Sequence, residues 1–380
     1  MKKNIFLVSG DASGDIYGAQ VIEALRRHDP ELSFSGMGGD RMQATGMHFL
    51  YNLVREFSVM GFLPILLGLP KVFHFWRIAI NYLKKERPDL IILIDYPGFN
   101  LFLASCVKKM KIPVVYYVTP QIWAWAPWRI KKIQKYIHKM LVIFPFEVPF
   151  YQKANVPVSY VGHPLLDRIA TFCPEENFQT NHNIKDPYLA LLPGSRRAEI
   201  EGNFPVMLWA WSRLREKYGD IPAVLALASD KYLPLIQKIY DERKVQYNLP
   251  ELTIIQKKAY DILVHSRFAL VTSGTATLET AILRTPMLVI YRVPKLHKKL
   301  APYFLQCKYF ALPNIISDQQ IIPEYLVTNE TPKEIQDTLF ALWTDSAERQ
   351  ACLDNLESMS KQLEKPGASE RVAQEVLQIL

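Results

Sequence analysis

The sequence predicts an α/β protein made of two domains, each with a parallel β-sheet covered by helices. Short, continuously apolar runs alternate with stretches of helical periodicity, and such runs are typical of strands buried on both faces of a parallel sheet. The alternation stops once, in a polar stretch over 171–187, and then restarts. We therefore expect an N-terminal domain over 1–170, a linker over 171–187 and a second domain over 188–345.

The N-terminal domain is expected to begin with a strand over 6–9 and a helix over 16–27. The apolar residues of this helix fall near one face, at Ile16, Ala19, Ile22 and Leu25. Further strands are predicted at 90–95, 114–118, 141–146 and 158–162.

The second domain is expected to contain strands at 188–195, 223–229, 252–256, 268–274 and 286–291. We expect the helical tail over 346–380 to pack back across a cleft between the two domains. Because ligands of parallel α/β sheets bind at the carboxyl ends of the strands, we expect the binding and catalytic residues to come directly after the strands in the sequence.

The composition limits the classes of function. The chain has 380 residues and a formal net charge of +8 at pH 7, which favours phosphorylated metabolites, anionic lipid or nucleic acid as partners. Nucleic acid is the least favoured, because three of the seven tryptophans cluster in one loop rather than along a basic stripe. The four cysteines form no CxxC pair, which argues against structural zinc and fits a cytoplasmic location. We find no apolar run of the roughly 18–20 residues that span a bilayer.

The segment SGDASGD over 9–15 joins the first strand to the first helix. Its small residues let a ligand approach the backbone, but its glycine spacing does not match the GxGxxG of dinucleotide-binding proteins. Asp15 fits the N-cap of the helix. The alternative is that Asp11 or Asp15, with Ser13 between them, faces the hydroxyls of a sugar acceptor or accepts a proton.

Asp95 is the main candidate for a general base, with Asp15 in reserve. It ends the strand over 90–95, where a partly desolvated carboxylate would have a pKa raised towards the working pH. The alternative is a turn aspartate that bonds its own backbone before Pro97.

The loop over 120–129 contains three tryptophans. Trp123 and Trp125 are candidates for covering a sugar ring or an acyl chain, because aromatic faces suit such surfaces; packing between helices is the alternative. Arg129 begins a basic helix that suits a phosphate or a membrane surface.

Two loops of the second domain predict a diphosphate site. In the first loop, Gly194 frees the backbone, Ser195 offers a hydroxyl and Arg196 offers a forked donor that matches phosphate geometry. The second loop consists of Ser273, Gly274 and Thr275. It opens a helix whose backbone amides would point at an anion, and Glu279 on that helix would cap it or bind ribose hydroxyls.

The sequence contains neither an Asp-x-Asp pair nor a GxxxxGKS loop. We therefore expect no metal and no other cofactor. The charge of a leaving diphosphate would instead be neutralised by Arg196, helix dipoles and backbone amides.

A set of short motifs recurs in a fixed order along nearly the whole chain. They are SGDASGD (9–15), GMGGDRM (36–42), VMG (59–61), DYPGFN (95–100), PQIWAW (120–125), PFE (145–147), VGHP (161–164), LLPGSR (191–196), SGTATLE (273–279) and LPN (312–314). With these motifs the chain resembles the bacterial lipid-A-disaccharide synthase family.

The resemblance implies a GT-B fold, in which two Rossmann-like domains face a cleft. It also implies an inverting glycosyltransferase that moves 2,3-diacylglucosamine from its UDP donor to 2,3-diacylglucosamine 1-phosphate, giving the β-1,6 disaccharide and UDP. The implied partners are these two substrates, the cytoplasmic face of the inner membrane and a second copy of the chain.

Several residues match functional positions of the family. Asp95 matches the favoured general base, Arg196 the arginine that serves UDP, and Asn314 a functional asparagine. Glu279 is similar to the acid that holds the ribose in related GT-B enzymes.

The chain departs from the family at two positions. Gly98 stands where a second acid is common, which leaves Asp95 as the sole acid of its motif. Asp11 stands where glutamate is common, which shortens its reach by one methylene.

The resemblance also suggests a membrane contact in the apolar region over 57–76, because both substrates carry acyl chains. The apolar residues concerned are Phe62, Ile65, Leu66 and Leu69. They lie near Lys71 and Arg77, a combination typical of helices in a membrane interface. A helix buried in the first domain is the alternative.

Two other functions fit the same loops. A nucleotide-sugar epimerase would leave the tryptophan loop and the apolar region without a role. A nucleotide-sugar-binding or membrane-scaffold protein would bind UDP without transferring a sugar.

Overall fold

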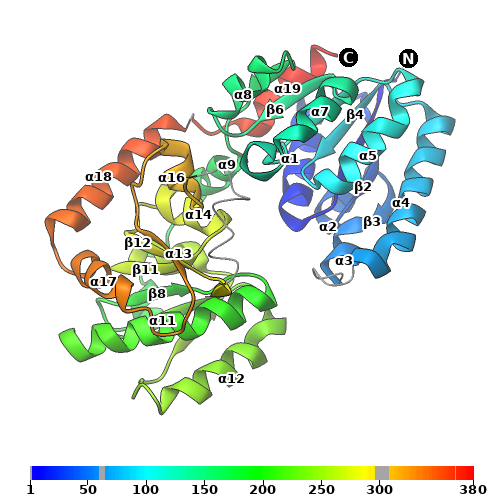
Figure 1. The fold of residues 1–380 in the computed structure, drawn as a ribbon. Helices are drawn as coiled ribbons and strands as arrows, with labels where there is room; N and C mark the ends of the chain where they lie inside the picture. Colours follow the sequence, from blue (N-terminus) through cyan, green and yellow to red (C-terminus); the bar gives the residue numbers. More distant parts are fainter. Residues whose placement is uncertain (1, 60–64, 296–307, 364) are drawn as a thin grey trace. The chain divides into compact units, whose positions relative to one another are not determined.

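The computed structural model describes residues 2–59, 65–295, 308–363 and 365–380, although not the side chains of 57–59, 65–70 and 125. The chain divides into two compact units (Figure 1). Unit 1 comprises Met1–Ala170 and Leu363–Leu380, and unit 2 comprises Thr171–Gln362.

Unit 1 is built on a seven-stranded parallel sheet. Its strands are β1 (Asn4–Ser9), β2 (Ser33–Gly38), β3 (His48–Asn52), β4 (Leu90–Ile94), β5 (Val114–Tyr117), β6 (Lys139–Val142) and β7 (Val158–Tyr160). Their order in the sheet is β3-β2-β1-β4-β5-β6-β7. The central strand β1 pairs with β2 and β4, so that Leu7 lies between Gly36 and Ile92.

Helices connect these strands and cover the sheet of unit 1. They are α1 (Ala12–His28), α2 (Asp40–Ala44), α3 (Leu53–Val59), α4 (Ile65–Glu86), α5 (Pro97–Val107), η1 (Lys108–Met110), α6 (Ile122–Trp125), η2 (Pro127–Arg129), α7 (Ile130–Tyr136), α8 (Glu147–Lys153), α9 (Pro164–Ala170) and α19 (Ala368–Leu377). Phe6 and Val8 of β1 pack in one core with residues of α4, α5 and α7. Ile5 and Leu7 are equally buried and, by the alternation of side chains along a strand, face the other side of the sheet.

Unit 2 repeats the plan with a six-stranded parallel sheet. Its strands are β8 (Leu189–Leu192), β9 (Ala223–Leu227), β10 (Thr253–Gln256), β11 (Phe268–Thr272), β12 (Met287–Arg292) and β13 (Glu324–Val327). Their order is β10-β9-β8-β11-β12-β13. The helices are α10 (Phe178–Asn181), α11 (Arg197–Tyr218), η3 (Asp230–Tyr232), α12 (Leu233–Lys244), α13 (Ala259–His265), α14 (Thr275–Ile282), α16 (Leu312–Ser317), η4 (Lys333–Ile335), α17 (Gln336–Trp343) and α18 (Ala347–Gln362).

The structure confirms the α/β class and the two parallel sheets. It differs from expectation in three segments that the sequence analysis did not assign as strands, namely β2, β3 and β13. The stretch over 171–187, expected as a linker, contains α10, whose Phe178 is 1% exposed. The helical tail is divided: α18 belongs to unit 2 and α19 to unit 1.

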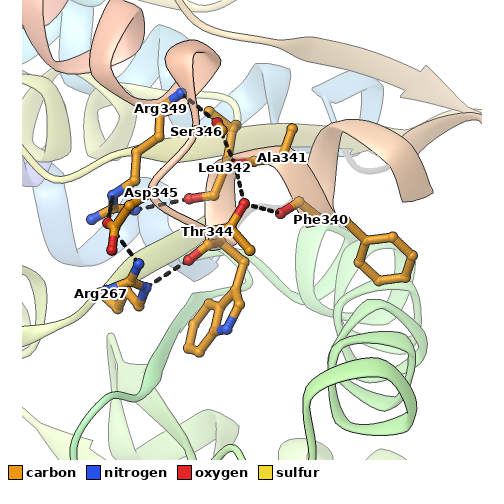
Figure 2. A network of polar contacts seen from close by, with 9 residues as sticks. Arg267, Phe340, Ala341, Leu342, Thr344, Asp345, Ser346 and Arg349 are labelled. Atoms are coloured by element: carbon orange, nitrogen blue, oxygen red, sulfur yellow. Dashed lines mark hydrogen bonds and ion pairs between the residues drawn. The ribbon is translucent and has the colours of Figure 1, made fainter.

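A polar network fastens the turn between α17 and α18 to the amino end of β11 (Figure 2). Arg267 donates from Nε to the carbonyl of Trp343 (2.6 Å) and from Nη2 to Oδ1 of Asp345 (2.8 Å). Arg349 donates to the carbonyl of Leu342 at 2.8 Å. Because the network lies at the amino end of a parallel strand, it stabilises unit 2 at the sheet edge opposite the candidate site.

Candidate functional site

The candidate site of unit 1 lies in the loops that follow β1 and β4. These neighbouring strands pair in register, with Ser9 opposite Ile94, so the residues after both strands meet at one sheet edge. The contact is close at Gly10, where an added Cβ would lie 2.5 Å from the ring of Tyr96. A larger residue at position 10 would require the ring of Tyr96 to shift.

Asp11 is the N-cap of α1, because its side chain accepts a hydrogen bond from the amide of Gly14 at 3.0 Å. The helix therefore begins at Ala12 and not at Ile16. Burial raises the pKa of Asp11 above its ordinary value, and the charge of Asp15 adds a smaller contribution in the same direction.

Asp15 neither caps α1 nor faces a sugar acceptor, the two roles considered for it. Its side chain is 4% exposed and accepts hydrogen bonds from the amides of Gly39 (2.7 Å), Met42 (2.9 Å) and Arg41 (2.9 Å). These amides lie at the start of α2, so Asp15 caps a neighbouring helix rather than its own. Ser13 lies in the first turn of α1 and is exposed.

Asp95 directly follows β4, as expected, and its backbone is left-handed with φ 46°. Burial and, second, the negative charge of Asp11 raise the pKa of Asp95 to about 7. A hydrogen bond with the backbone at Tyr96 opposes this shift. The carboxyl group is therefore poised to exchange a proton near neutral pH.

The tryptophan loop is anchored by a carboxylate that the sequence analysis did not assign. Glu147 is 1% exposed and accepts hydrogen bonds from Thr119 Oγ1 (2.8 Å), Trp123 Nε1 (3.2 Å) and the amide of Phe144 (3.1 Å). Burial raises the pKa of Glu147 to about 7 against these hydrogen bonds. The signal was the PFE motif, whose acid follows a predicted strand.

The remaining residues of this loop lie in different surroundings. Trp123 is half-buried and packs edge-on against Phe146, with ring centroids 4.9 Å apart, whereas Trp128 is 67% exposed. Arg129 is half-buried, and its charge acts on the hydroxyl of Tyr116, whose pKa it lowers against the larger effect of burial. The side chain of Trp125 lies outside the described residues.

The predicted diphosphate loops of unit 2 follow two paired strands, β8 and β11, with Leu192 opposite Val271. In the first loop, Gly194 has φ 117°, a conformation that favours glycine. The amides of Ser195 (3.0 Å) and Arg196 (3.2 Å) both donate to Oε2 of Glu199. Arg196 also pairs with Oε1 of Glu199 at 3.2 Å, and its side chain is 75% exposed. Glu199 was missed, although an acid three residues into a helix is the signal of a capping box.

The second loop opens α14 as expected. Gly274 has φ 151° and, with Thr275, is exposed at the start of the helix. The hydroxyl of Ser273 donates to the carbonyl of Phe310 at 2.9 Å. Glu279 is half-buried and accepts a hydrogen bond from the hydroxyl of Tyr260 at 3.0 Å.

Asn314 lies inside unit 2 with 0% of its side chain exposed. Its Oδ1 accepts from the amides of Ile321 (2.8 Å) and Ile322 (3.0 Å), and its Nδ2 donates to the carbonyl of Ile322 (2.9 Å). Through these bonds the side-chain amide of Asn314 stabilises the turn after α16. In this structure, therefore, the amide binds the backbone of unit 2 and does not point to a ligand site.

The structure describes only part of the predicted membrane region. Phe62 and the side chains of Ile65, Leu66 and Leu69 lie outside the described residues. The described part of α4 continues this region with Phe73, 56% exposed, beside Phe102 of α5, 39% exposed. Within the described ranges, no helix combines the length and apolarity that crossing a membrane requires. Nor do three His, Cys, Asp or Glu side chains of these ranges gather in a way that could hold a metal ion.

The sequence as a whole decides among the functions left open. A family model described as lipid-A-disaccharide synthetase matches residues 5–379. The chain belongs to the lipid-A-disaccharide synthetase family. It is 36% identical over 380 residues to the lipid-A-disaccharide synthase of Coxiella burnetii (strain CbuK_Q154), with 98% of both chains covered. It is 35% identical to that of Geobacter sulfurreducens, with 99% of this chain and 97% of the relative covered.

Several solved structures resemble this chain in fold. A UDP-GlcNAc 2-epimerase from Neisseria meningitidis, bound to UDP-GlcNAc, has a TM-score of 0.65 at 15% identity and covers 99% of this chain and 100% of its own. MurG of Acinetobacter baumannii has a TM-score of 0.58 at 12% identity and 99% coverage of both chains. These neighbours confirm the GT-B fold. Family membership, in turn, assigns a glycosyltransferase of lipid A biosynthesis and sets the epimerase and the non-catalytic alternatives aside.

Proposed function

We propose that the chain transfers 2,3-diacylglucosamine from UDP-2,3-diacylglucosamine to 2,3-diacylglucosamine 1-phosphate, with inversion at the anomeric carbon and Asp95 as general base. The strongest support for this mechanism comes from one observation. In a chain of this family, a half-buried carboxyl group with a pKa raised to about 7 follows β4 at the carboxyl edge of the sheet. A base with such a pKa is matched to proton abstraction near neutral pH.

In the proposed step, the acceptor hydroxyl gives its proton to Asp95 while its oxygen forms a bond to the anomeric carbon of the donor. The bond from that carbon to the UDP oxygen breaks, and its electron pair leaves with UDP. Attack from the face opposite the leaving group inverts the centre. Asp11 assists because its charge favours the protonated form of Asp95 that the step produces.

We assign UDP to unit 2. Arg196, whose side chain is 75% exposed, and the amides that open α14 would neutralise the charge that grows on the leaving diphosphate. Glu279, partly buried at Tyr260, would bind the ribose hydroxyls. Asn314 would contribute by shaping the turn after α16. No step needs a metal ion.

The test is turnover of the Asp95→Asn variant, with both acylated substrates, in buffer containing EDTA. We expect turnover to fall at least about a hundredfold, since a positioned general base typically contributes 10²–10⁴-fold, while UDP still binds. In the unmodified chain, turnover should rise as the pH rises through about 7, because the base must be deprotonated. Asp40→Asn is the matched control, because Asp40 is 72% exposed and its carboxylate contacts two side chains of unit 1, Arg55 at 3.5 Å and Asn52 at 2.7 Å.

Near-normal turnover by Asp95→Asn would remove this residue from the mechanism. Complete dependence of the unmodified chain on a divalent ion would contradict the metal-free assignment. Mass analysis of the product, which should be the disaccharide 1-phosphate, separates transfer from simple hydrolysis of the donor.

We also propose that unit 1 binds the cytoplasmic face of the inner membrane through the aromatic cluster of α4 and α5. Phe73 and Phe102 are exposed, and Trp76 stacks on Phe102 with ring centroids 3.9 Å apart. Exposed aromatic rings near basic residues suit a membrane interface.

Sedimentation with anionic phospholipid vesicles tests this contact. The Phe73→Ser/Phe102→Ser variant should bind vesicles several-fold more weakly than the unmodified chain, whereas Val245→Ser, at a residue 88% exposed in unit 2, should bind normally. Equal binding of all three proteins would remove the cluster from the membrane contact.

A further inference from the structure

The turn that carries Asp95 has an unfavourable backbone. Asp95 and Tyr96 are consecutive non-glycine residues with φ 46° and 47°. Left-handed backbone of this kind persists only where the surrounding structure enforces it, and it is concentrated at functional sites. The turn must therefore be held from outside.

Two buried side chains hold it at a single atom, the carbonyl oxygen of Asp95. The hydroxyl of Tyr116 donates to this oxygen at 2.6 Å, and Nδ2 of Asn100 donates to it at 2.7 Å. Asn100 also donates to the carbonyl of Ile94 at 3.1 Å. Both side chains are 0% exposed.

The backbone on either side of this carbonyl is also fixed. The amide of Asp95 donates to the carbonyl of Tyr117 at 3.1 Å, and the amide of Asn100 donates to the carbonyl of Tyr96 at 3.1 Å. These bonds join the turn to β5 and to α5. None of these hydrogen bonds uses the carboxyl group, which itself bonds the backbone at Tyr96.

We propose that Tyr116 and Asn100 are positioning residues that hold the left-handed Asp95 turn and thereby fix where its carboxyl group lies. This inference rests on the proposed function of Asp95 as the base. The geometry assigns the two side chains a part in the chemistry although both are fully buried.

The charged surroundings of the carboxyl group connect this geometry to the pH profile. The titratable groups that face the turn are Asp11 from the loop after β1, Tyr96 on the turn itself and Tyr116 from β5, with Arg129 from η2 acting on Tyr116. Burial and the charge of Asp11 raise the pKa of Asp95. A turn that relaxes towards solvent would lose both effects, so the pKa would fall.

The decisive variant is Tyr116→Phe, which removes one hydroxyl and leaves the ring. The chain offers a matched control in the next residue. Tyr117 is also 0% exposed, but its hydroxyl has no hydrogen-bond partner within the part of the chain that the structure describes. Tyr117→Phe keeps the backbone carbonyl that Asp95 uses.

With both acylated substrates, we expect Tyr116→Phe to lower kcat by about ten- to a hundredfold, since small displacements of a catalytic group have effects of this size. The KM for the UDP donor should stay unchanged, because that substrate is assigned to unit 2. The acid limb of the kcat profile should move to lower pH. Tyr117→Phe should change none of these quantities.

Other outcomes decide against the proposal. Normal kcat and an unmoved acid limb in Tyr116→Phe, with an inactive Asp95→Asn, would overturn the bracing role and leave the base in place. Full turnover by Asp95→Asn would instead overturn the base and the bracing role together. A lowered melting temperature with an unmoved acid limb would mean that the hydroxyl serves the fold alone.

If Tyr116→Phe does not fold, Asn100→Leu decides, because it removes the donor hydrogens at nearly constant size and adds no charge beside Asp95. The same shift of the acid limb is expected from it. Failure of both variants to fold, while Tyr117→Phe folds, would also overturn the proposal, since the pair would then be needed for unit 1 itself.

Discussion

At the scale of single residues, Asp11 and Asp15 show how environment separates two acids on one short segment. Asp11 caps α1 with one hydrogen bond, and its negative charge raises the pKa of Asp95. Asp15 has both carboxylate oxygens bonded to amides at the start of α2. The sequence offered both as candidates for the base, and only the folded contacts separate them.

Asp15→Asn should therefore destabilise unit 1 without removing the chemistry. We expect a loss of about 1–3 kcal/mol in the free energy of unfolding, since a buried charge-assisted bond is weakened. Turnover per folded molecule should stay within a few-fold of normal. Urea unfolding and turnover measured on the same preparation check both numbers, and an inactive but fully stable variant would restore Asp15 as a candidate base.

At the scale of elements, the sequence predicted strands well where side chains are continuously apolar. β4 and β5 were expected because every residue in them is apolar and buried. β2 (SFSGMG) and β13 (EYLV) were missed because glycine, serine and glutamate interrupt the apolar pattern. In β2, Gly36 lets the backbone pass close to β1, where a Cβ would lie 1.9 Å from the carbonyl of Leu7.

The candidate site was predictable in part for a related reason. Asp95, Arg196 and the loop at Ser273 follow apolar strands, and residues in such places can be identified without a structure. Glu147, Tyr116 and Asn100 could not be given roles, because their contacts join segments that only the folded sheet brings together.

The network of Figure 2 predicts a defined loss of stability in unit 2. Arg267→Ala removes the hydrogen bonds to Trp343 and Asp345 and leaves a carbonyl without its charged donor, so we expect a loss of about 1–3 kcal/mol. Arg284→Ala is the control, because Arg284 is 58% exposed and 3.9 Å from Glu357. Urea unfolding compares the two, and equal stability would show that the network contributes nothing measurable.

At the scale of the whole molecule, the chain passes from unit 1 to unit 2 and returns. The last helix, α19, packs against α1, and Lys139 pairs with Glu375 at 2.5 Å. Asp167 of α9 accepts hydrogen bonds from the amides of Gly367, Ala368 and Ser369 at the start of α19. The C-terminal segment is therefore a structural part of unit 1.

Asp167→Ala should loosen this segment. We expect unit 1 to lose about 1–3 kcal/mol, because several amides at a helix N-terminus lose their acceptor. Limited proteolysis should remove the tail faster, while UDP binding by unit 2 stays normal. Asp354→Ala, at an exposed position of α18, should leave the cleavage rate unchanged, and equally slow cleavage of both variants would contradict the anchoring role of Asp167.

The insertion of unit 2 between the two segments of unit 1 affects how the protein is made. Lys3 bonds the carbonyl of Leu380, and both ends belong to unit 1 (Figure 1). A ribosome therefore releases all of unit 2 before it has synthesised the final helix of unit 1. Unit 1 therefore stays incomplete until α19 has been synthesised, whereas all residues of unit 2 are available to fold before that point.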